Sequence, residues 1–220
     1  MPNRTPAYDQ LLRACQPYGA SLVAVSKTRT IPEMMVLYDQ GQRVFAENKV
    51  QEIITKAPLM PKDVKWHLIG HLQTNKVKSI LPVVSCIQSM DSERLWEKIN
   101  EEAIKLNKTI DVLLQIKIAQ EESKYGWDKD ELLKVIHSGQ PTSWNNVIVR
   151  GVMGMATLTD DQVQVRNEMR QLKLYYDQLK STVYSTLPGF NIISMGMSGD
   201  YKIALEEGSN MVRIGTALFE

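Results

Sequence analysis

The sequence contains little cysteine and little histidine. It has two cysteines, Cys15 and Cys86, without CxxC spacing, and three histidines in 220 residues. Two separated cysteines and the lack of a signal peptide argue against a disulfide framework and indicate a reducing compartment, so we expect a cytoplasmic protein. The histidines and cysteines do not have the spacing of zinc ligands, so we expect no metal site.

The sequence also lacks an excess of charge of one sign and a long apolar run. Its 26 basic and 25 acidic residues leave a formal net charge of +1. This balance argues against general attraction to nucleic acid or to an anionic membrane. No apolar run approaches the roughly 20 residues that a membrane-spanning helix needs. A phosphate-bearing ligand would therefore need a local site.

The chain has enough apolar sequence to build a substantial core. Hydrophobic residues make up 43% of it and charged residues 23%, which is typical of a soluble globular domain. A (β/α)8 barrel commonly takes about 200 to 250 residues. We therefore expect residues 1–220 to form a single domain.

Eight strand-like segments alternate with helix-like segments along the chain. The predicted strands are residues 21–27, 43–46, 65–70, 83–88, 111–118, 147–153, 191–195 and 210–214. A further helix is predicted within residues 4–18, before the first strand. Since no linker or change of composition divides the chain, the pattern predicts a single-domain (β/α)8 TIM barrel with an extra N-terminal helix, rather than an open doubly wound sheet.

The first predicted strand ends at Lys27. The apolar, β-branched residues 22–25 precede it, and Thr30 and Glu33 behind it have the spacing of a capping box at a helix start. In such barrels the reactive groups lie at the carboxyl ends of the strands. Lys27 is therefore a candidate Schiff-base former. The alternative is a solvated lysine at the rim, which is the commoner fate of this residue type.

Two glycine-containing loops follow the last two predicted strands. The first carries Ser198 and Gly199 at a helix start, and the second carries Gly215 and Thr216. Free N–H groups and the helix dipole at such a start favour an anion, although serine and glycine there also serve as plain caps. Barrels often hold phosphate in the loops after strands seven and eight, so these two loops predict a phosphate site.

Strand alternation predicts that Arg213 points into the barrel. Gly215, two residues later, shares its face, whereas Val212 and Ile214 should face the helices. A buried cation needs a partner. The sequence leaves open whether that partner is an interior carboxylate in a structural salt bridge or a ligand.

The same alternation predicts that the side chain of Lys27 points to the same face of the strand as those of Val23 and Val25. An apolar mouth and the like charge of Arg213 would lower the pKa of Lys27 and favour the nucleophilic amine. A lysine amine, a phosphate-binding pair of loops and an inward arginine together describe a site for pyridoxal 5'-phosphate (PLP).

Several motifs resemble those of the YggS/PROSC family of pyridoxal-phosphate homeostasis proteins. They are Ala24-Val25-Ser26-Lys27-Thr28, Phe45-Ala46-Glu47-Asn48, Trp66-His67-Leu68-Ile69-Gly70-His71-Leu72-Gln73-Thr74-Asn75-Lys76, Ser194-Met195-Gly196-Met197-Ser198 and Val212-Arg213-Ile214-Gly215-Thr216. The resemblance extends from about residue 21 to the end of the chain. It implies a barrel similar to the N-terminal domain of bacterial alanine racemase, with PLP held as an aldimine on Lys27.

The resemblance also implies which residues surround the cofactor. Arg213 would lie at the pyridine nitrogen and Asn48 close to the ring, although Asn48 could equally be a helix cap. The full set of predicted cofactor-binding residues is Lys27, Asn48, Ser194, Ser198, Gly199, Arg213, Gly215 and Thr216. Lys49, Lys76, Lys78 and Lys124 are predicted to be solvated or rim charges, and a secondary cofactor-holding role for one of them is left open.

Three functions are compatible with these residues. The resemblance implies a PLP-binding protein of cellular PLP homeostasis, and the alternatives are a PLP-dependent racemase or decarboxylase and a cofactor-free Schiff-base lyase. A two-base racemase needs a second acid/base group, which alanine racemase obtains from an additional domain of a partner subunit. A cationic Arg213 would also weaken the electron sink of the pyridine ring. We therefore expect a monomer that is not an enzyme, with PLP and PLP-dependent apo-enzymes as partners, and leave weak racemase activity open.

Overall fold

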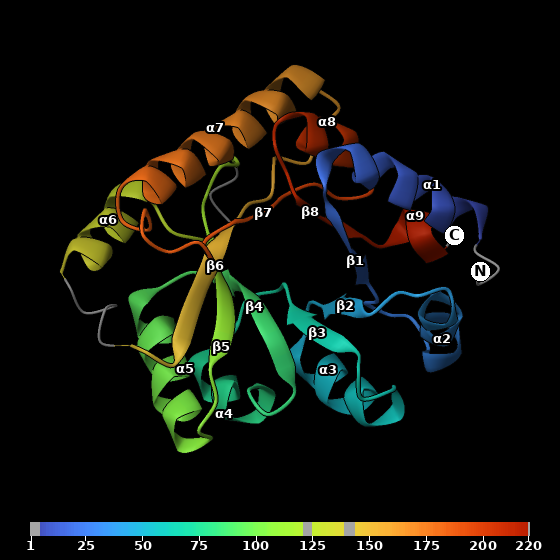
Figure 1. The fold of residues 1–220 in the computed structure, drawn as a ribbon, viewed down its shortest axis with the longest axis horizontal. Helices are drawn as coiled ribbons and strands as arrows, with labels where there is room; N and C mark the ends of the chain where they lie inside the picture. The colour runs from blue at the N-terminus through green and yellow to red at the C-terminus, as the bar shows by residue number, and fades with distance from the viewer. Residues whose placement is uncertain (1–4, 121–124, 139–143, 220) are drawn as a thin grey trace.

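The protein forms a closed barrel of eight parallel strands in the order β1-β2-β3-β4-β5-β6-β7-β8. A computed structural model describes residues 5–120, 125–138 and 144–219 (Figure 1). The strands are β1 (Ser21–Val25), β2 (Val44–Glu47), β3 (Lys65–Leu68), β4 (Val84–Met90), β5 (Ile110–Gln115), β6 (Val147–Met153), β7 (Ile192–Ser194) and β8 (Met211–Ile214). The prediction of a (β/α)8 barrel is confirmed.

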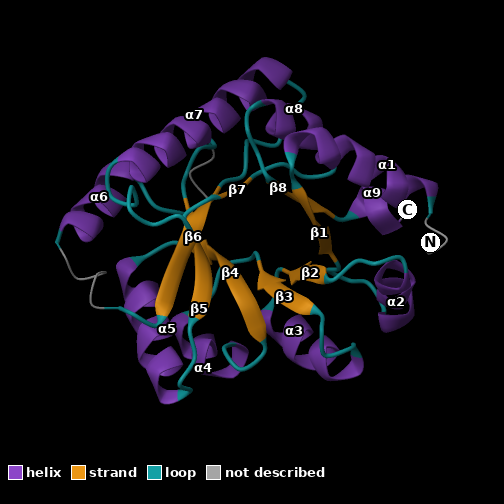
Figure 2. Cartoon of the chain, in the orientation of Figure 1, coloured by secondary structure: helices purple, strands orange, loops and turns teal. Residues whose placement is uncertain are grey.

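Helices surround the barrel on its outside (Figure 2). They are α1 (Pro6–Cys15), α2 (Ile31–Asp39), α3 (Val50–Lys56), α4 (Val77–Ile80), α5 (Glu93–Lys105), α6 (Lys129–His137), α7 (Gln162–Ser181), α8 (Tyr201–Glu206) and α9 (Thr216–Phe219). Short 3-10 turns occupy Gln16–Tyr18, Ala57–Leu59 and Thr74–Lys76. The predicted extra N-terminal helix is α1, which lies beside α9 in Figure 1.

The alternation of side chains along the strands separates two apolar layers. Leu22, Ala24, Val212 and Ile214 pack outward against the helices. A second, inner cluster fills the barrel and includes Val23, Val25, Ala46, Cys86, Leu113, Met153 and Met211. The predicted orientations of Val23, Val25, Val212 and Ile214 are therefore confirmed.

Two predicted capping boxes have different outcomes. At α2 the box is present: Thr30 N donates to Glu33 Oε2 at 2.7 Å, and Thr30 Oγ1 accepts from Glu33 N. The sequence Asp128-Lys129-Asp130-Glu131 resembles a capping box and predicts a second one at α6, but this prediction is wrong, because the side chain of Asp128 makes no cap bond. Its Oδ2 instead accepts from Lys117 Nζ at 3.0 Å, so an ion pair takes the carboxylate away from the helix end.

The fifth strand is shorter than predicted. It ends at Gln115, and Ile116 forms an isolated bridge with Trp127. Trp127 N donates to Gln115 O at 2.7 Å, and Lys117 N donates to Trp127 O at 3.1 Å. The apolar sequence continues past Gln115, where Ile116 N still donates to Met153 O of β6 at 2.8 Å, while the backbone also pairs with the segment before α6.

The ring closes with little pairing between β7 and β8. Their ladder has one register pair, Ser194 opposite Met211, whereas β1 and β8 share four pairs. Loop bonds supplement it, including Arg213 N to Gly196 O at 3.0 Å and Asn210 N to Ile193 O at 3.1 Å. The two loops predicted to bind phosphate emerge from this seam.

The described helices include none with the length and apolar character of a membrane span. The described residues also contain no group of three or more histidine, cysteine, aspartate or glutamate side chains arranged to hold a metal ion.

Candidate cofactor site

Lys27 lies in a tight turn between β1 and α2, at the end of the barrel where the strands finish. Ser26 N donates to Ala46 O at 2.9 Å, which extends the pairing of β1 with β2 by one residue, and Arg29 N then closes the turn on Ser26 O at 3.0 Å. Lys27 itself is exposed. The expectation of an enclosed lysine is therefore wrong, because β1 ends at Val25 and not at Lys27.

The loops after β7 and β8 come together at Ser198. The Ser198 hydroxyl accepts from Ala217 N at 3.5 Å, which connects the start of α8 to the start of α9. Gly215 follows β8 beside β1, where an added Cβ would lie 3.3 Å from Val25 O. The structure thus places Ser198, Gly199, Gly215 and Thr216 in one group of adjoining loops next to the strand that precedes Lys27.

These loops offer free donors to an anion. Within the described part of the chain, the backbone N–H groups of Ser198, Gly199 and Thr216 have no protein acceptor. A Cβ added to Gly199 would meet nothing within 4 Å, so its backbone is open to a ligand. By contrast, Met197 N donates to Asp200 Oδ1 at 2.5 Å. Unpartnered N–H groups and a hydroxyl are the donor set that a phosphate group needs.

Arg213 points into the barrel, as predicted. It is 3% exposed, and its Nη1 donates to Ser194 Oγ at 2.7 Å and its Nη2 to Gly154 O at 2.9 Å. Burial lowers the pKa of Arg213 to about 10, while the charge of Asp200 acts in the opposite direction. The guanidinium is thus a cation at neutral pH. No described carboxylate forms an ion pair with it, so a structural salt bridge is not what holds it.

A chain of buried side chains continues from Arg213 across the interior. Ser194 Oγ donates to Gln88 Oε1 at 2.7 Å, and Gln88 Nε2 lies 2.9 Å from His67 Nδ1. Burial, with a smaller effect of Lys65, lowers the pKa of His67 to about 4, so the imidazole is neutral at pH 7. Because the Gln88 amide donates, His67 Nδ1 accepts and the ring proton is on Nε2.

Sequence analysis missed Gln88 and His67 as part of this site. His67 pairs with Ala46, and Gln88 lies two residues beyond Cys86 on β4. Ala46 and Cys86 both belong to the inner cluster. The alternation that placed Arg213 would therefore have placed Gln88 and His67 inside as well, had it been applied to β3 and β4.

Asn48 lies at the rim, after β2. It is exposed, and the N-cap position of α3 is Lys49, which makes no side-chain cap bond. The alternative role of Asn48 as a helix cap is therefore not realised. Its backbone instead packs against Gly70, where an added Cβ would collide with the Asn48 carbonyl. We call the loops that carry Ser198 and Gly199, and Gly215 and Thr216, the phosphate-type loops. No hydrogen bond within the described residues connects Asn48 or Lys27 to them.

A histidine–aspartate pair lies at the same rim. His71 Nδ1 is 2.7 Å from Asp91 Oδ2, and the His71 ring stacks on Tyr125 with 3.8 Å between centroids. His71 follows β3, Asp91 follows β4, and Gln115 at the end of β5 donates to Tyr125 O. His67 and His71 thus each have a polar partner within the protein, and His71 lies at the mouth of the barrel.

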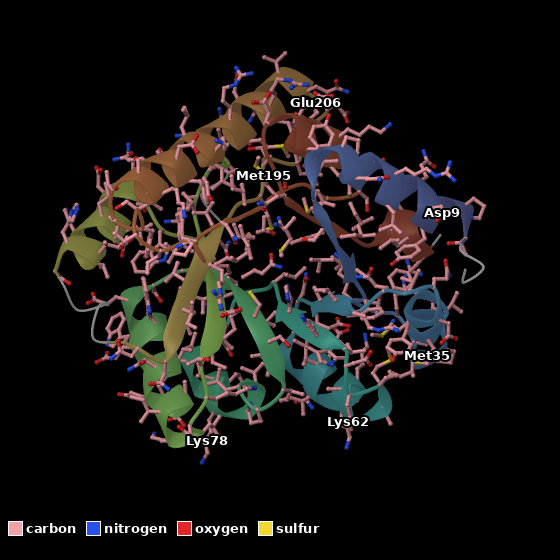
Figure 3. The ribbon with its side chains drawn as sticks, in the orientation of Figure 1. Asp9, Met35, Lys62, Lys78, Met195 and Glu206 are labelled. Atoms are coloured by element: carbon pink, nitrogen blue, oxygen red, sulfur yellow. The ribbon has the colours of Figure 1, made fainter. Side chains whose placement is uncertain are left out.

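The lysines predicted to be solvated lie on the surface where the structure describes them. Lys49, Lys76 and Lys78 are exposed, and Figure 3 shows Lys78 pointing away from the molecule. Lys124 lies outside the described residues. None of the three described lysines has a side-chain hydrogen bond to the predicted cofactor-binding residues.

The fold and these residues define a class of protein. It is a (β/α)8 barrel with unpartnered N–H groups in the loops after β7 and β8, a buried arginine on β8 and an exposed lysine after β1. The family model "Alanine racemase, N-terminal domain" matches residues 7–220. The chain belongs to this family and, within it, to the pyridoxal phosphate homeostasis proteins, which confirms the resemblance found in the sequence.

Two relatives of known name illustrate this membership. The pyridoxal phosphate homeostasis protein of Aquifex aeolicus is 36% identical over 217 residues, covering 96% of this chain and 93% of the relative. That of Pasteurella multocida is 35% identical over 206 residues, covering 91% of this chain and 86% of the relative.

Solved structures agree with the fold. PipY of Synechococcus elongatus with PLP bound is 32% identical, with a TM-score of 0.83 over 97% of this chain and all of PipY. Alanine racemase of Bartonella henselae is 20% identical, with a TM-score of 0.75, and this chain covers 56% of it. The second likeness concerns the barrel alone.

Proposed function

We propose that this protein binds PLP and acts in PLP homeostasis. The observation that carries the proposal is the arrangement at neighbouring strand ends of the Lys27 amine, the unpartnered N–H groups of Ser198, Gly199 and Thr216, and the buried guanidinium of Arg213. PLP has an aldehyde, a phosphate and a pyridine nitrogen, and each of these matches one part of the arrangement. Relatives bearing the homeostasis name and the PLP-containing PipY support the assignment.

Each predicted residue has a role in this proposal. The loops of Ser198, Gly199, Gly215 and Thr216 bind the phosphate through backbone N–H groups and hydroxyls. Arg213 donates to the pyridine nitrogen, and Ser194 holds Arg213 in place through the 2.7 Å bond. Asn48 lies at the rim close to the ring.

Lys27 supplies the covalent attachment. Its amine would condense with the aldehyde of PLP, so that a C=N bond would replace the C=O bond with the loss of one water molecule. The exposed position of Lys27 leaves this bond accessible to water and to an incoming amine, and such access favours release and transfer over storage.

We propose further that the protein is not an enzyme of amino-acid metabolism. Arg213 keeps its proton with a pKa of about 10, so it leaves the pyridine nitrogen unprotonated and the ring a weak electron sink. The lysine side of the site is open to water, which reduces the electrostatic stabilisation of a carbanion. The protein would act as a cytoplasmic, single-domain monomer that passes PLP to PLP-dependent apo-enzymes.

A second candidate function, weak racemisation, rests on His71. Its bond to Asp91 Oδ2 orients the ring at the mouth of the barrel, and an imidazole held in this way is able to transfer a proton. This group would supply the second acid/base residue that Lys27 alone lacks.

The proposal is tested by loading the protein with PLP, reducing it with borohydride and mapping the peptides. We expect the pyridoxyl group on Lys27. Transfer is then measured by mixing the loaded protein with an apo-enzyme that depends on PLP and following the recovery of that enzyme's activity. An adduct mainly on another lysine would contradict the assignment.

A further inference from the structure

The turn that carries Lys27 has a strained residue next to it. Thr28 has a φ of +64°, in the left-handed region that β-branched residues rarely adopt. Strain of this kind persists only where surrounding contacts enforce it. Some part of the protein must therefore hold this turn in place.

Three charged side chains from β2 and α3 hold the residues on both sides of Lys27. Lys56 Nζ donates to Ser26 O at 2.8 Å, to Glu47 Oε1 at 2.7 Å and to Glu52 Oε2 at 3.2 Å. Ser26 Oγ also donates to Glu47 Oε1 at 2.7 Å. We name Glu47, Glu52 and Lys56 the turn clamp.

On the other side of Lys27, the clamp holds the strained residue. Thr28 N donates to Glu52 Oε2 at 3.2 Å. This bond fixes the direction of the Thr28 N–H group and therefore opposes relaxation of the turn to a negative φ. Lys27 has no bond of its own to the clamp, so its backbone is held by Ser26 and Thr28 while its amine stays free.

The clamp is buried at a cost to stability. The side chain of Glu47 is 0% exposed and that of Lys56 is 12% exposed. Burial raises the pKa of Glu47, although the bonds from Lys56 and Ser26 oppose the rise. Glu47 Oε2 has no hydrogen-bond partner within the described residues. Well-packed apolar residues often replace a buried ion pair without loss of stability, so stability alone does not account for this cluster.

We propose that the turn clamp is a positioning device that holds Lys27 in the orientation from which its amine reaches the aldehyde of the cofactor. The inference rests on the proposed function. Glu52 is the member that controls the strained Thr28, and Glu47 and Lys56 anchor Ser26. None of the three touches the cofactor, so each is a positioning residue.

The experiment separates binding from covalent attachment with two ligands. PLP uses both the phosphate-type loops and Lys27, whereas pyridoxine 5'-phosphate has no aldehyde and uses the loops alone. Dissociation constants for both are measured for the wild type, Glu52→Ala and Glu52→Gln. Glu33→Ala is the matched control, because Glu33 also accepts a backbone N–H at a loop, that of Thr30, but does not touch the residues next to Lys27.

We expect Glu52→Ala to weaken PLP binding about tenfold, the equivalent of one lost charge-assisted hydrogen bond, and to change pyridoxine 5'-phosphate binding less than about twofold. Glu52→Gln keeps an oxygen acceptor for Thr28 N and should lie closer to the wild type. Thr28→Gly added to Glu52→Ala should restore most of the PLP affinity, since glycine adopts a positive φ without strain. Glu33→Ala should leave both affinities at the wild-type values.

A readout without cofactor accompanies these measurements. The amide hydrogen of Thr28 should exchange faster in Glu52→Ala than in the wild type, because its acceptor is gone. Three results would overturn the proposal. They are equal losses of affinity for both ligands in Glu52→Ala, an unchanged PLP affinity in that variant, and a failure of Thr28→Gly to restore the PLP affinity. If Glu52→Ala does not fold, the dissociation constants of Glu52→Gln and of Thr28→Gly for the two ligands are compared with those of the wild type instead. If the wild type forms no Lys27 adduct, the proposed function fails, and the amide exchange of Thr28 still tests whether the clamp holds the turn.

Discussion

Arg213 donates its Nη1 proton to the hydroxyl of Ser194 at 2.7 Å, inside the barrel. Since arginine only donates, the Ser194 oxygen must accept here and donate its own proton to Gln88. The Gln88 amide then donates to His67. One bond between two residues thus fixes the proton positions of four side chains. Together with the bond from Nη2 to Gly154 O, it orients the guanidinium from behind and leaves only the N–H groups outside these two bonds for a ligand.

The first prediction concerns the separation of the Lys27 amine from the phosphate-type loops. Lys27→Ala should abolish the borohydride-trapped adduct at this position, while pyridoxine 5'-phosphate binds within about twofold of the wild type, because no hydrogen bond joins Lys27 to the loops. Equilibrium dialysis measures both. Loss of all binding in Lys27→Ala would show that the phosphate lies elsewhere.

The second prediction concerns the Ser194 hydroxyl. Ser194→Ala removes the acceptor of Arg213 Nη1 and the donor to Gln88 Oε1. Each buried polar group left without a partner costs about 1 to 3 kcal/mol, so the loss of both partners should lower the free energy of unfolding by roughly 2 to 6 kcal/mol. Urea denaturation measures this change.

The control for this variant is Ser185→Ala. Ser185 is exposed and donates to Thr182 O in the loop after α7. Its removal should change the free energy of unfolding by less than about 0.5 kcal/mol. Similar effects of the two substitutions would contradict the importance of the buried chain.

The third prediction concerns pH and His67. The pKa of His67 is about 4 in the folded protein and about 6.5 in the unfolded chain. Between these values the unfolded state binds more protons, so stability is lost as the pH falls from about 6.5 to 4. The contribution of His67 to this loss is roughly 3 kcal/mol.

The measurement is denaturation of wild type and His67→Gln across this pH range. The variant keeps an acceptor for Gln88 and should show a flatter profile. His137→Gln, which changes an exposed residue at the end of α6, is the control and should keep the wild-type slope. Parallel profiles for wild type and His67→Gln would show that His67 titrates normally.

The fourth prediction concerns chemistry on amino acids. In heavy water, the PLP-loaded protein should exchange the α-proton of L- and D-amino acids within about tenfold of the rate with free PLP, because the site is open and the ring nitrogen is unprotonated. Exchange many orders of magnitude faster, with racemisation, would replace the carrier function by the racemase function. If that rate collapses in His71→Gln, the His71 and Asp91 pair supplies the second acid/base group.

Much of the site could be predicted because it follows from local rules. The period of two along β8 placed Arg213 inside, and glycine and hydroxyl residues marked the loops after β7 and β8. The register did not need to be known for either inference, because each uses only the sequence of a single strand and the loop that follows it.

The parts that were missed depend on contacts between distant segments. The turn clamp of Glu47, Glu52 and Lys56 contacts Ser26 and Thr28, and only the folded pairing of β1 with β2 and the packing of α3 bring these residues together. The left-handed Thr28 was not predictable either, because threonine has no preference for that conformation. The exposure of Lys27 follows from where β1 ends, and single-sequence boundaries are uncertain by about two to four residues.

The single register pair between β7 and β8 bears on how the barrel responds to a ligand. No other two neighbouring strands of the ring share so few register pairs, and the two phosphate-type loops emerge at this place. Local opening there would separate one loop from the other while the remaining strands stay paired. A phosphate held by both loops would fasten this seam. Ligand binding would then slow the hydrogen exchange of the amides of β7 and β8. Without ligand, the barrel would open locally at this place first.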